Sequence, residues 1–153
     1  MKKNIKLDKK LFIILITTAT IIIADQITKK LITHFLEFSQ SISLINNFLY
    51  LTLIHNYGAA FGMLQNTTSM LIWISVIAIG VILYFYEKIP KKTSIIIYVS
   101  FILGGTISNL IDRIRLGYVI DFIDFGIWPA FNIADSVITI GAIGLIIYLF
   151  RKK

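Results

Sequence analysis

Four apolar stretches, each close to 20 residues long, constrain the fold of this 153-residue chain more than any other feature. A helix needs about 20 apolar residues to cross the roughly 30 Å hydrocarbon core of a bilayer. Hydrophobic residues make up 57% of the chain, a share typical of membrane proteins. The sequence therefore predicts a mostly α-helical membrane protein with a single membrane-embedded domain over residues 1–153. Its four transmembrane helices are expected at about residues 11–31, 69–86, 93–111 and 134–150.

The basic residues are distributed unevenly around these stretches. Eleven of the fifteen lie in residues 2–10, in the turn between the second and third stretches, or after the fourth. Lys and Arg are enriched in cytoplasmic loops, so this asymmetry predicts that both termini are cytoplasmic. The segments at about 33–68 and 113–133 are then extracytoplasmic. Membrane topology accounts for the net charge of +7, and nucleic-acid binding is not expected.

The first extracytoplasmic segment is too apolar to be a free loop. Two β-prone runs, SISLI and FLYLTLI, are separated by Asn46 and Asn47, which favour a turn. The following run, HNYGAAFGMLQN, contains Asn56, Gly58 and Gly62, a composition typical of tight backbone geometry. We expect a small strand-containing platform, with one amphipathic turn, on the outer membrane surface.

Polar side chains interrupt the outer ends of three apolar stretches at a similar depth. Asp25 follows fourteen uncharged residues and Asp135 precedes fifteen. At 1.5 Å per residue these carboxylates lie roughly 21 and 22 Å from the inner edge, and Asn109 lies about 24 Å from Lys92. Asp25 and Lys29 are four residues apart and can form an ion pair on one helix face. Because ionisable groups within a bilayer are costly, this layer indicates a functional site.

The third stretch carries a further pattern that bears on this layer. Gly105 and Asn109 share one helix face with Asp112 or Arg113. A glycine on such a face permits the close approach of a neighbouring helix. We therefore expect this face to be buried against another helix of the bundle.

Two more aspartates, Asp121 and Asp124, lie in the predicted loop between the third and fourth stretches, where either can approach Asp135. Two carboxylates in a poorly solvated site cannot both ionise cheaply, so one holds a proton. Such a pair can activate a water and protonate a leaving amine, as in aspartic proteases. Spacing alone does not choose between Asp121 and Asp124. A helix N-cap is an alternative role for Asn132 or Asp135.

Other chemistries find less support in the sequence. It contains no HExxH, GxSxG or GxxxxGK motif, and the absence of cysteine removes thiol nucleophiles and cysteine metal ligands. No metal site and no cofactor are expected. The alternative function is a small four-helix transporter or ion-binding protein that uses the carboxylate layer. Transporters usually show internal repeats, and none is evident in the sequence.

Five motifs occur in order along essentially the whole chain: ADQITK, HNYGAAFG, GGTISNLIDR, VIDFIDF and FNIADS. Together they resemble the motifs of the bacterial lipoprotein signal peptidases (type II signal peptidases), which are membrane aspartyl proteases. The resemblance implies that Asp121 and Asp135 are the catalytic aspartates. Two features depart from the family pattern, namely Ser108, where glycine is common, and a short interval between the two aspartates. The positions that match residues shaping the family's site are Asp25, Lys29, Asn56, Gly58, Gly105, Asn109, Arg113 and Asn132.

The resemblance also implies a substrate and a location. Enzymes of this family remove the signal peptide of prolipoproteins by cleaving just before a cysteine that carries diacylglycerol, and the cyclic peptide globomycin targets them. The chain is thus expected to be an aspartic endopeptidase of the bacterial cytoplasmic (inner) membrane. It would be a multi-pass protein with its active site near the extracytoplasmic face. Its expected partners are prolipoproteins and membrane lipid, and the chain is expected to be a monomer.

Overall fold

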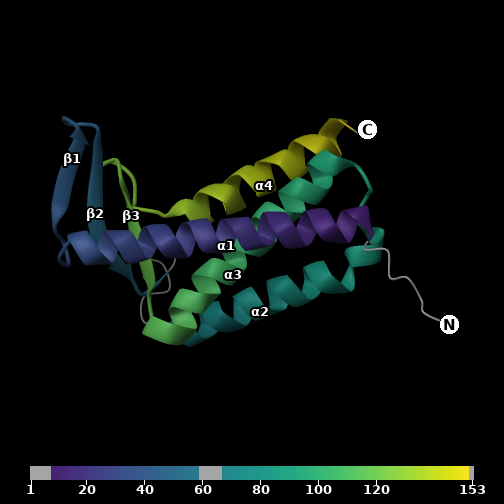
Figure 1. The fold of residues 1–153 in the computed structure, drawn as a ribbon, viewed down its shortest axis with the longest axis horizontal. Helices are drawn as coiled ribbons and strands as arrows, with labels where there is room; N and C mark the ends of the chain where they lie inside the picture. The colour runs from purple at the N-terminus through teal and green to yellow at the C-terminus, as the bar shows by residue number, and fades with distance from the viewer. Residues whose placement is uncertain (1–7, 59–66, 152–153) are drawn as a thin grey trace.

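The computed structural model describes residues 8–58 and 67–151. In this part of the chain the helices lie side by side, the sheet lies at one end of them, and the start of α1 and the end of α4 lie at the other end (Figure 1). The elements in chain order are α1 (Lys9–Phe35), β1 (Ser41–Ile45), β2 (Leu49–Asn56), α2 (Thr68–Tyr84), the 3₁₀ turn η2 (Tyr86–Lys88), α3 (Thr93–Leu116), β3 (Val119–Asp124) and α4 (Ile133–Arg151).

All four apolar stretches form helices, but the bounds differ from those predicted. α1 continues to Phe35, and α3 continues through Arg113 to Leu116, because helical hydrogen bonding does not stop where the apolar run stops. Gly117 then ends α3 in the left-handed conformation, with φ of 83° and its N–H bonded to the Arg113 carbonyl. Helices α1, α3 and α4 are long and apolar enough to cross a membrane, whereas α2 is a shorter apolar helix of 17 residues.

Helix α3 lies in contact with each of the other three helices and forms the centre of the bundle. It approaches α4 closely at Gly105, where an added Cβ would lie 2.5 Å from the Ala134 carbonyl oxygen and 2.6 Å from Ile138 Cγ1. The glycine expected to admit a neighbouring helix therefore does so. The outer faces of the helices expose large apolar side chains such as Trp73 and Phe150, as a lipid-facing surface requires.

The platform is a three-stranded antiparallel sheet in the order β1-β2-β3. The predicted turn at Asn46 and Asn47 joins β1 to β2, and Asn47 adopts a φ of 58°. The prediction of a loop around Asp121 was wrong, because residues 119–124 form β3 and Asp121 pairs with Ile54 of β2. Val119 to Phe122 are all buried, so this strand lacks the alternation by which a half-exposed strand is identified.

Some expectations concern residues outside the described ranges. The tight backbone geometry expected at Gly62 falls within residues 59–66. Part of the basic N-terminal segment falls within residues 1–7, and the last two lysines are residues 152 and 153.

Candidate active site

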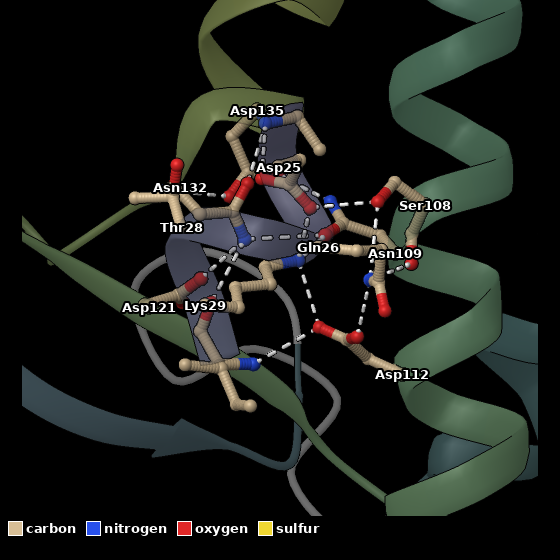
Figure 2. A network of polar contacts seen from close by, with 12 residues as sticks. Asp25, Gln26, Thr28, Lys29, Ser108, Asn109, Asp112, Asp121, Asn132 and Asp135 are labelled. Carbon is tan, nitrogen blue, oxygen red and sulfur yellow. Dashed lines mark hydrogen bonds and ion pairs between the residues drawn. The ribbon is translucent and has the colours of Figure 1, made fainter. Parts of the chain in front are cut away.

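The polar side chains predicted to lie at one depth converge between α1, α3, β3 and the start of α4 (Figure 2). Each element contributes from a different direction, so the cluster requires the complete arrangement of helices and sheet. Its members from the sequence prediction are Asp25, Lys29, Asn109, Asp121, Asn132 and Asp135.

Asparagine side-chain amides hold the carboxylates of Asp121 and Asp135. Asp121 is 1% exposed, and its two carboxylate oxygens accept hydrogen bonds from Asn56 Nδ2 at 2.8 Å and Asn132 Nδ2 at 2.7 Å. Asp135 Oδ1 accepts a hydrogen bond from Asn109 Nδ2 at 2.8 Å. The two carboxylates thus face one region of the protein from a strand and from a helix start.

The first turn of α4 fixes the position of Asp135. Asn132 caps this helix, because its Oδ1 accepts a hydrogen bond from the Asp135 N–H at 2.9 Å. In return, Asp135 Oδ2 accepts a hydrogen bond from the Asn132 N–H at 3.3 Å. This reciprocal capping box satisfies two backbone donors that the helix itself leaves free. Asn132 and Asp135 therefore both take part in the cap. The Asp135 carboxylate still belongs to the site, because its Oδ1 binds Asn109.

Lys29 of α1 makes three buried contacts, and two of them reach α3. Its Nζ lies 2.7 Å from Asp25 Oδ2 and 2.7 Å from Asp112 Oδ2, and it donates to Asn109 Oδ1 at 2.9 Å. Lys29 and its two carboxylate partners are at most 3% exposed. The predicted pair between Asp25 and Lys29 is confirmed. A buried ion pair fixes geometry only when its remaining bonding capacity is also satisfied, and here Asn109 completes it.

The network is completed by three side chains that were not proposed as site residues, those of Gln26, Ser108 and Asp112. Ser108 Oγ donates to Asp25 Oδ2 at 2.7 Å, and Gln26 Nε2 donates to Asp112 Oδ1 at 2.7 Å. Asp25 Oδ1 accepts from the Ala134 N–H at 2.9 Å, which ties α1 to the start of α4. The serine that departs from the family pattern thus supplies a hydrogen bond. Ser108 and Asp112 are four residues apart on α3, and this helical spacing is the sequence signal that could have identified both residues.

The structure distinguishes Asp121 from Asp124. Side chains alternate across a strand, so two residues three apart point to opposite faces. Asp124 Oδ2 accepts a hydrogen bond from Thr52 Oγ1 at 2.9 Å, and its Oδ1 accepts from the Gly126 N–H at 2.7 Å. Asp124 therefore stabilises the sheet and the following turn, whereas Asp121 joins the polar network.

A cleft of about 710 Å³ opens onto both carboxylates of the pair. Burial raises the pKa of Asp121 to about 7, and the negative charge of Asp135 acts in the same direction. The hydrogen bonds from Asn56 and Asn132 and the charge of Lys29 oppose this rise. A carboxyl group with a pKa near neutrality can hold a proton while its neighbour is ionised.

The remaining proposed residues line or shape this cleft. Arg113, Asn56 and Gly58 line it, and Arg113 Nη2 donates to the Gly58 carbonyl oxygen at 3.4 Å. The Gly58 N–H in turn donates to Asn56 Oδ1 at 3.0 Å, which orients the amide that binds Asp121. Gly105 acts from outside the cleft by setting the distance between α3 and α4. Within the described residues, no three His, Cys, Asp or Glu side chains form a group that could hold a metal ion.

Comparison with known sequences and structures gives one consistent result. The family described as signal peptidase (SPase) II matches residues 17–151. A lipoprotein signal peptidase of Halothermothrix orenii is 41% identical over 90% of this chain and 95% of its own length. The corresponding protein of Caldanaerobacter subterraneus subsp. tengcongensis is 47% identical over 84% of this chain and 90% of its own.

Solved structures agree with the sequence comparison. A bacterial membrane enzyme determined by the in meso method at 2.3 Å resolution superposes with a TM-score of 0.84 and 34% identity. The superposition covers 90% of this chain and 87% of that chain. A second such structure, at 1.9 Å resolution, gives a TM-score of 0.83 and 33% identity. With both its fold and its sequence matching, the chain belongs to the signal peptidase II family, the lipoprotein signal peptidases.

Proposed function

We propose that Asp121 and Asp135 form the catalytic pair of an aspartic endopeptidase that removes signal peptides from prolipoproteins. The scissile bond is the one before the diacylglyceryl-modified cysteine. The observation that carries this proposal is the convergence of two carboxylates, from β3 and from α4, on one cleft. Membership in a peptidase family leaves the transporter alternative without support.

The pair operates with one proton between its two carboxylates. The ionised carboxylate accepts a proton from a water molecule as the water oxygen attacks the carbonyl carbon of the scissile bond. The protonated carboxyl group donates its proton toward the reacting amide, and the C–N bond then breaks with the amine leaving protonated. The pKa of Asp121, raised to about 7, favours Asp121 as the carrier of that proton. Neither residue needs a metal or cofactor for this sequence of steps.

The surroundings of the pair suit these steps. Asn109, Asn132 and Asn56 hold the carboxylates by their amide groups, which keep their donors at any pH in the physiological range. The apolar wall of the cleft includes Phe131 and Ile138, which can pack against an aliphatic chain. Arg113 and the Gly58 backbone lie at the same cleft, where they can contact the polar backbone of a peptide.

We further propose that this single peptidase domain spans the bacterial cytoplasmic (inner) membrane four times, as a monomer. Both termini are cytoplasmic, and the active site lies near the extracytoplasmic face. The separation of charge supports this orientation. Lys10 donates to the Tyr86 carbonyl of η2, and Lys92 lies over the Tyr148 ring of α4, so these cations gather at the end opposite the sheet. A lipid-modified cysteine anchored in the outer leaflet then lies at the depth of the carboxylate layer.

Cleavage of a diacylglyceryl-modified prolipoprotein by the purified protein tests the catalytic assignment. Asp121→Asn and Asp135→Asn should each lower the cleavage rate by about 10²–10⁴-fold, because each removes one half of an acid–base pair. The double variant should be scarcely slower than either single variant, since residues that act as a unit are strongly non-additive.

Asp124→Asn is the matched control, because Asp124 lies on the same strand but bonds to Thr52 and Gly126. It should retain most of the activity. Normal cleavage by Asp121→Asn, or loss in Asp124→Asn while Asp121→Asn remains active, would show that the wrong aspartate had been assigned.

A further inference from the structure

A second groove runs along the outer half of α1 against α3 and the start of β3. Its volume is about 700 Å³, and it shares no lining residue with the cleft at Asp121 and Asp135. Nearest the middle of α1 the lining is apolar, with Ile22, Ile23 and Ile27. One to two turns closer to the sheet it becomes cationic, with Lys30 from α1 and Arg115 from α3. The groove is therefore apolar at one end and basic at the other.

The two cations at this groove lack carboxylate partners. Among the described residues, the only salt bridges are those of Lys29 with Asp25 and Asp112. Lys30 and Arg115 have no described carboxylate oxygen within 4.0 Å, and both are exposed. Asp112 also lines the groove, but it is buried and its two oxygens bind Lys29 and Gln26, each at 2.7 Å. The open end of the groove therefore carries uncompensated positive charge.

We propose that this groove is a binding site for an anionic phospholipid. The phosphodiester group binds between Lys30 and Arg115, and an acyl chain lies along Ile22, Ile23 and Ile27. Guanidinium and ammonium groups form charge-assisted hydrogen bonds with phosphate oxygens, and Arg binds two oxygens at once. Helices α1 and α3 are both apolar and long enough to cross a membrane, which brings lipid to the groove from the side.

The proposed lipid site and the catalytic cleft bind different chemical groups. The diacylglyceryl group of the proposed substrate carries no phosphate, whereas the pair of cations selects for one. The inner wall of the groove includes Lys29 and Asp112. Asp112 Oδ2 also accepts from the Ile120 N–H at 3.3 Å, next to Asp121 in β3. A phospholipid bound in this groove therefore contacts Lys29 and Asp112, which belong to the network that supports Asp121. The catalytic cleft stays free for substrate, because the two sites share no lining residue.

Native mass spectrometry of the full chain released from detergent measures this binding directly. Titration with phosphatidylglycerol should show saturable binding of one lipid molecule. Phosphatidylethanolamine, whose headgroup has no net charge, should bind at least about tenfold more weakly. Inorganic phosphate is the third probe and should not bind saturably. Equal affinity for both lipids, or saturable binding of inorganic phosphate alone, would overturn the proposal.

The double variant Lys30→Gln/Arg115→Gln should weaken phosphatidylglycerol binding at least about tenfold, because both phosphate contacts are lost. Lys88→Gln/Lys91→Gln removes the same formal charge at the other end of the bundle and should leave binding unchanged. Thermal unfolding without added lipid should be the same for both variants, since all four side chains are exposed. Equal binding by the groove variant and the wild type, or equal weakening in both double variants, would exclude this site.

Discussion

At the scale of single residues, Asn132 sets the relation between the two aspartates. Its Nδ2 donates to Asp121 Oδ1 at 2.7 Å, while its Oδ1 accepts from the Asp135 N–H at 2.9 Å. One amide therefore holds a strand residue and a helix residue at once. Since Asn132 Nδ2 also lies 3.1 Å from Asn109 Oδ1, the same side chain reaches α3. The relative position of Asp121 and Asp135 thus depends on Asn132, an uncharged residue.

The raised pKa of Asp121 predicts the pH dependence of cleavage. Burial keeps Asp121 protonated up to a pH of about 7, and it loses this proton as the pH rises further. A pair that needs one shared proton should therefore lose kcat/KM as the pH rises through about 7. The profile is measured on a lipid-modified substrate and reports apparent values for the pair, not for one residue.

Asn56→Ala tests the physical cause of this pH limit. Its Nδ2 donates to Asp121 at 2.8 Å, and a donor to a carboxylate favours the ionised form. Loss of the donor should raise the pKa of Asp121 further and move the alkaline limit to higher pH, whatever the residual rate. Thr52→Val, which removes the donor to Asp124, is the control and should leave the limit in place. A limit that does not move in Asn56→Ala would contradict the contribution of Asp121 to this limit.

The sequence predicted the members of the site better than their contacts. Depth along the apolar stretches was sufficient for Asp25, Asn109 and Asp135, because helix rise is constant and the membrane has a fixed thickness. The choice of Asp121 over Asp124 needed the family resemblance and stays a prediction. The structure supports it, because Asp124 binds Thr52 and Gly126 whereas Asp121 joins the polar network. The hydrogen bonds of Ser108 could not be predicted, because they depend on how α1 and α3 are rotated about their axes.

At the scale of elements, the contact between α3 and α4 decides the geometry of the site. These helices carry Asn109 and Asp135, which are joined by a hydrogen bond of 2.8 Å. Their separation is limited at Gly105, where no side chain fits against Ala134 and Ile138. Sequence periodicity predicted this face of α3. It did not predict β3, because that strand is buried on both faces and pairs with β2, a partner distant in the sequence.

Gly105→Ala should lower both stability and cleavage. The new Cβ would lie 2.5 Å from the Ala134 carbonyl oxygen, so α4 must move away and the bond between Asn109 and Asp135 must lengthen. Overpacking of this kind costs about 1–3 kcal/mol. Thermal unfolding in detergent and the cleavage rate measure the two effects.

Gly80→Ala is the matched control in α2, because nothing lies within 4 Å of a Cβ added there. It should leave cleavage unchanged and raise stability by up to about 1 kcal/mol, because Ala favours a helix over Gly. If both glycine variants behave alike, the close approach at Gly105 does not control the site.

At the scale of the whole molecule, the bundle has two chemically different ends. The end near η2 carries lysines that include Lys10, Lys88 and Lys92, and the end near the sheet carries the carboxylate layer. Because Lys and Arg favour the cytoplasmic side, this polarity supports the proposed orientation, with the η2 end in the cytoplasm. Charge counts alone were sufficient to predict that the lysines and the carboxylate layer lie at opposite ends. The orientation in the membrane stays a prediction.

Labelling of single cysteines tests the orientation without background, because the chain contains no native cysteine. Pro90→Cys, beside η2, should react with a membrane-impermeant maleimide only after the membrane is opened. Ile127→Cys, at a position that is 93% exposed beyond β3, should react in intact spheroplasts. External labelling at position 90 would reverse the proposed orientation.

The tie between Asp25 and the start of α4 has a consequence for the order of biosynthesis. A ribosome makes α1, α3 and β3 before α4, the last of the described helices in chain order. Until α4 enters the membrane, Asp25 lacks the Ala134 N–H and Asp121 lacks Asp135. On the proposed mechanism, a chain whose synthesis has not yet reached α4 is therefore proteolytically inactive, and neighbouring membrane proteins are exposed to the peptidase only after α4 has been made.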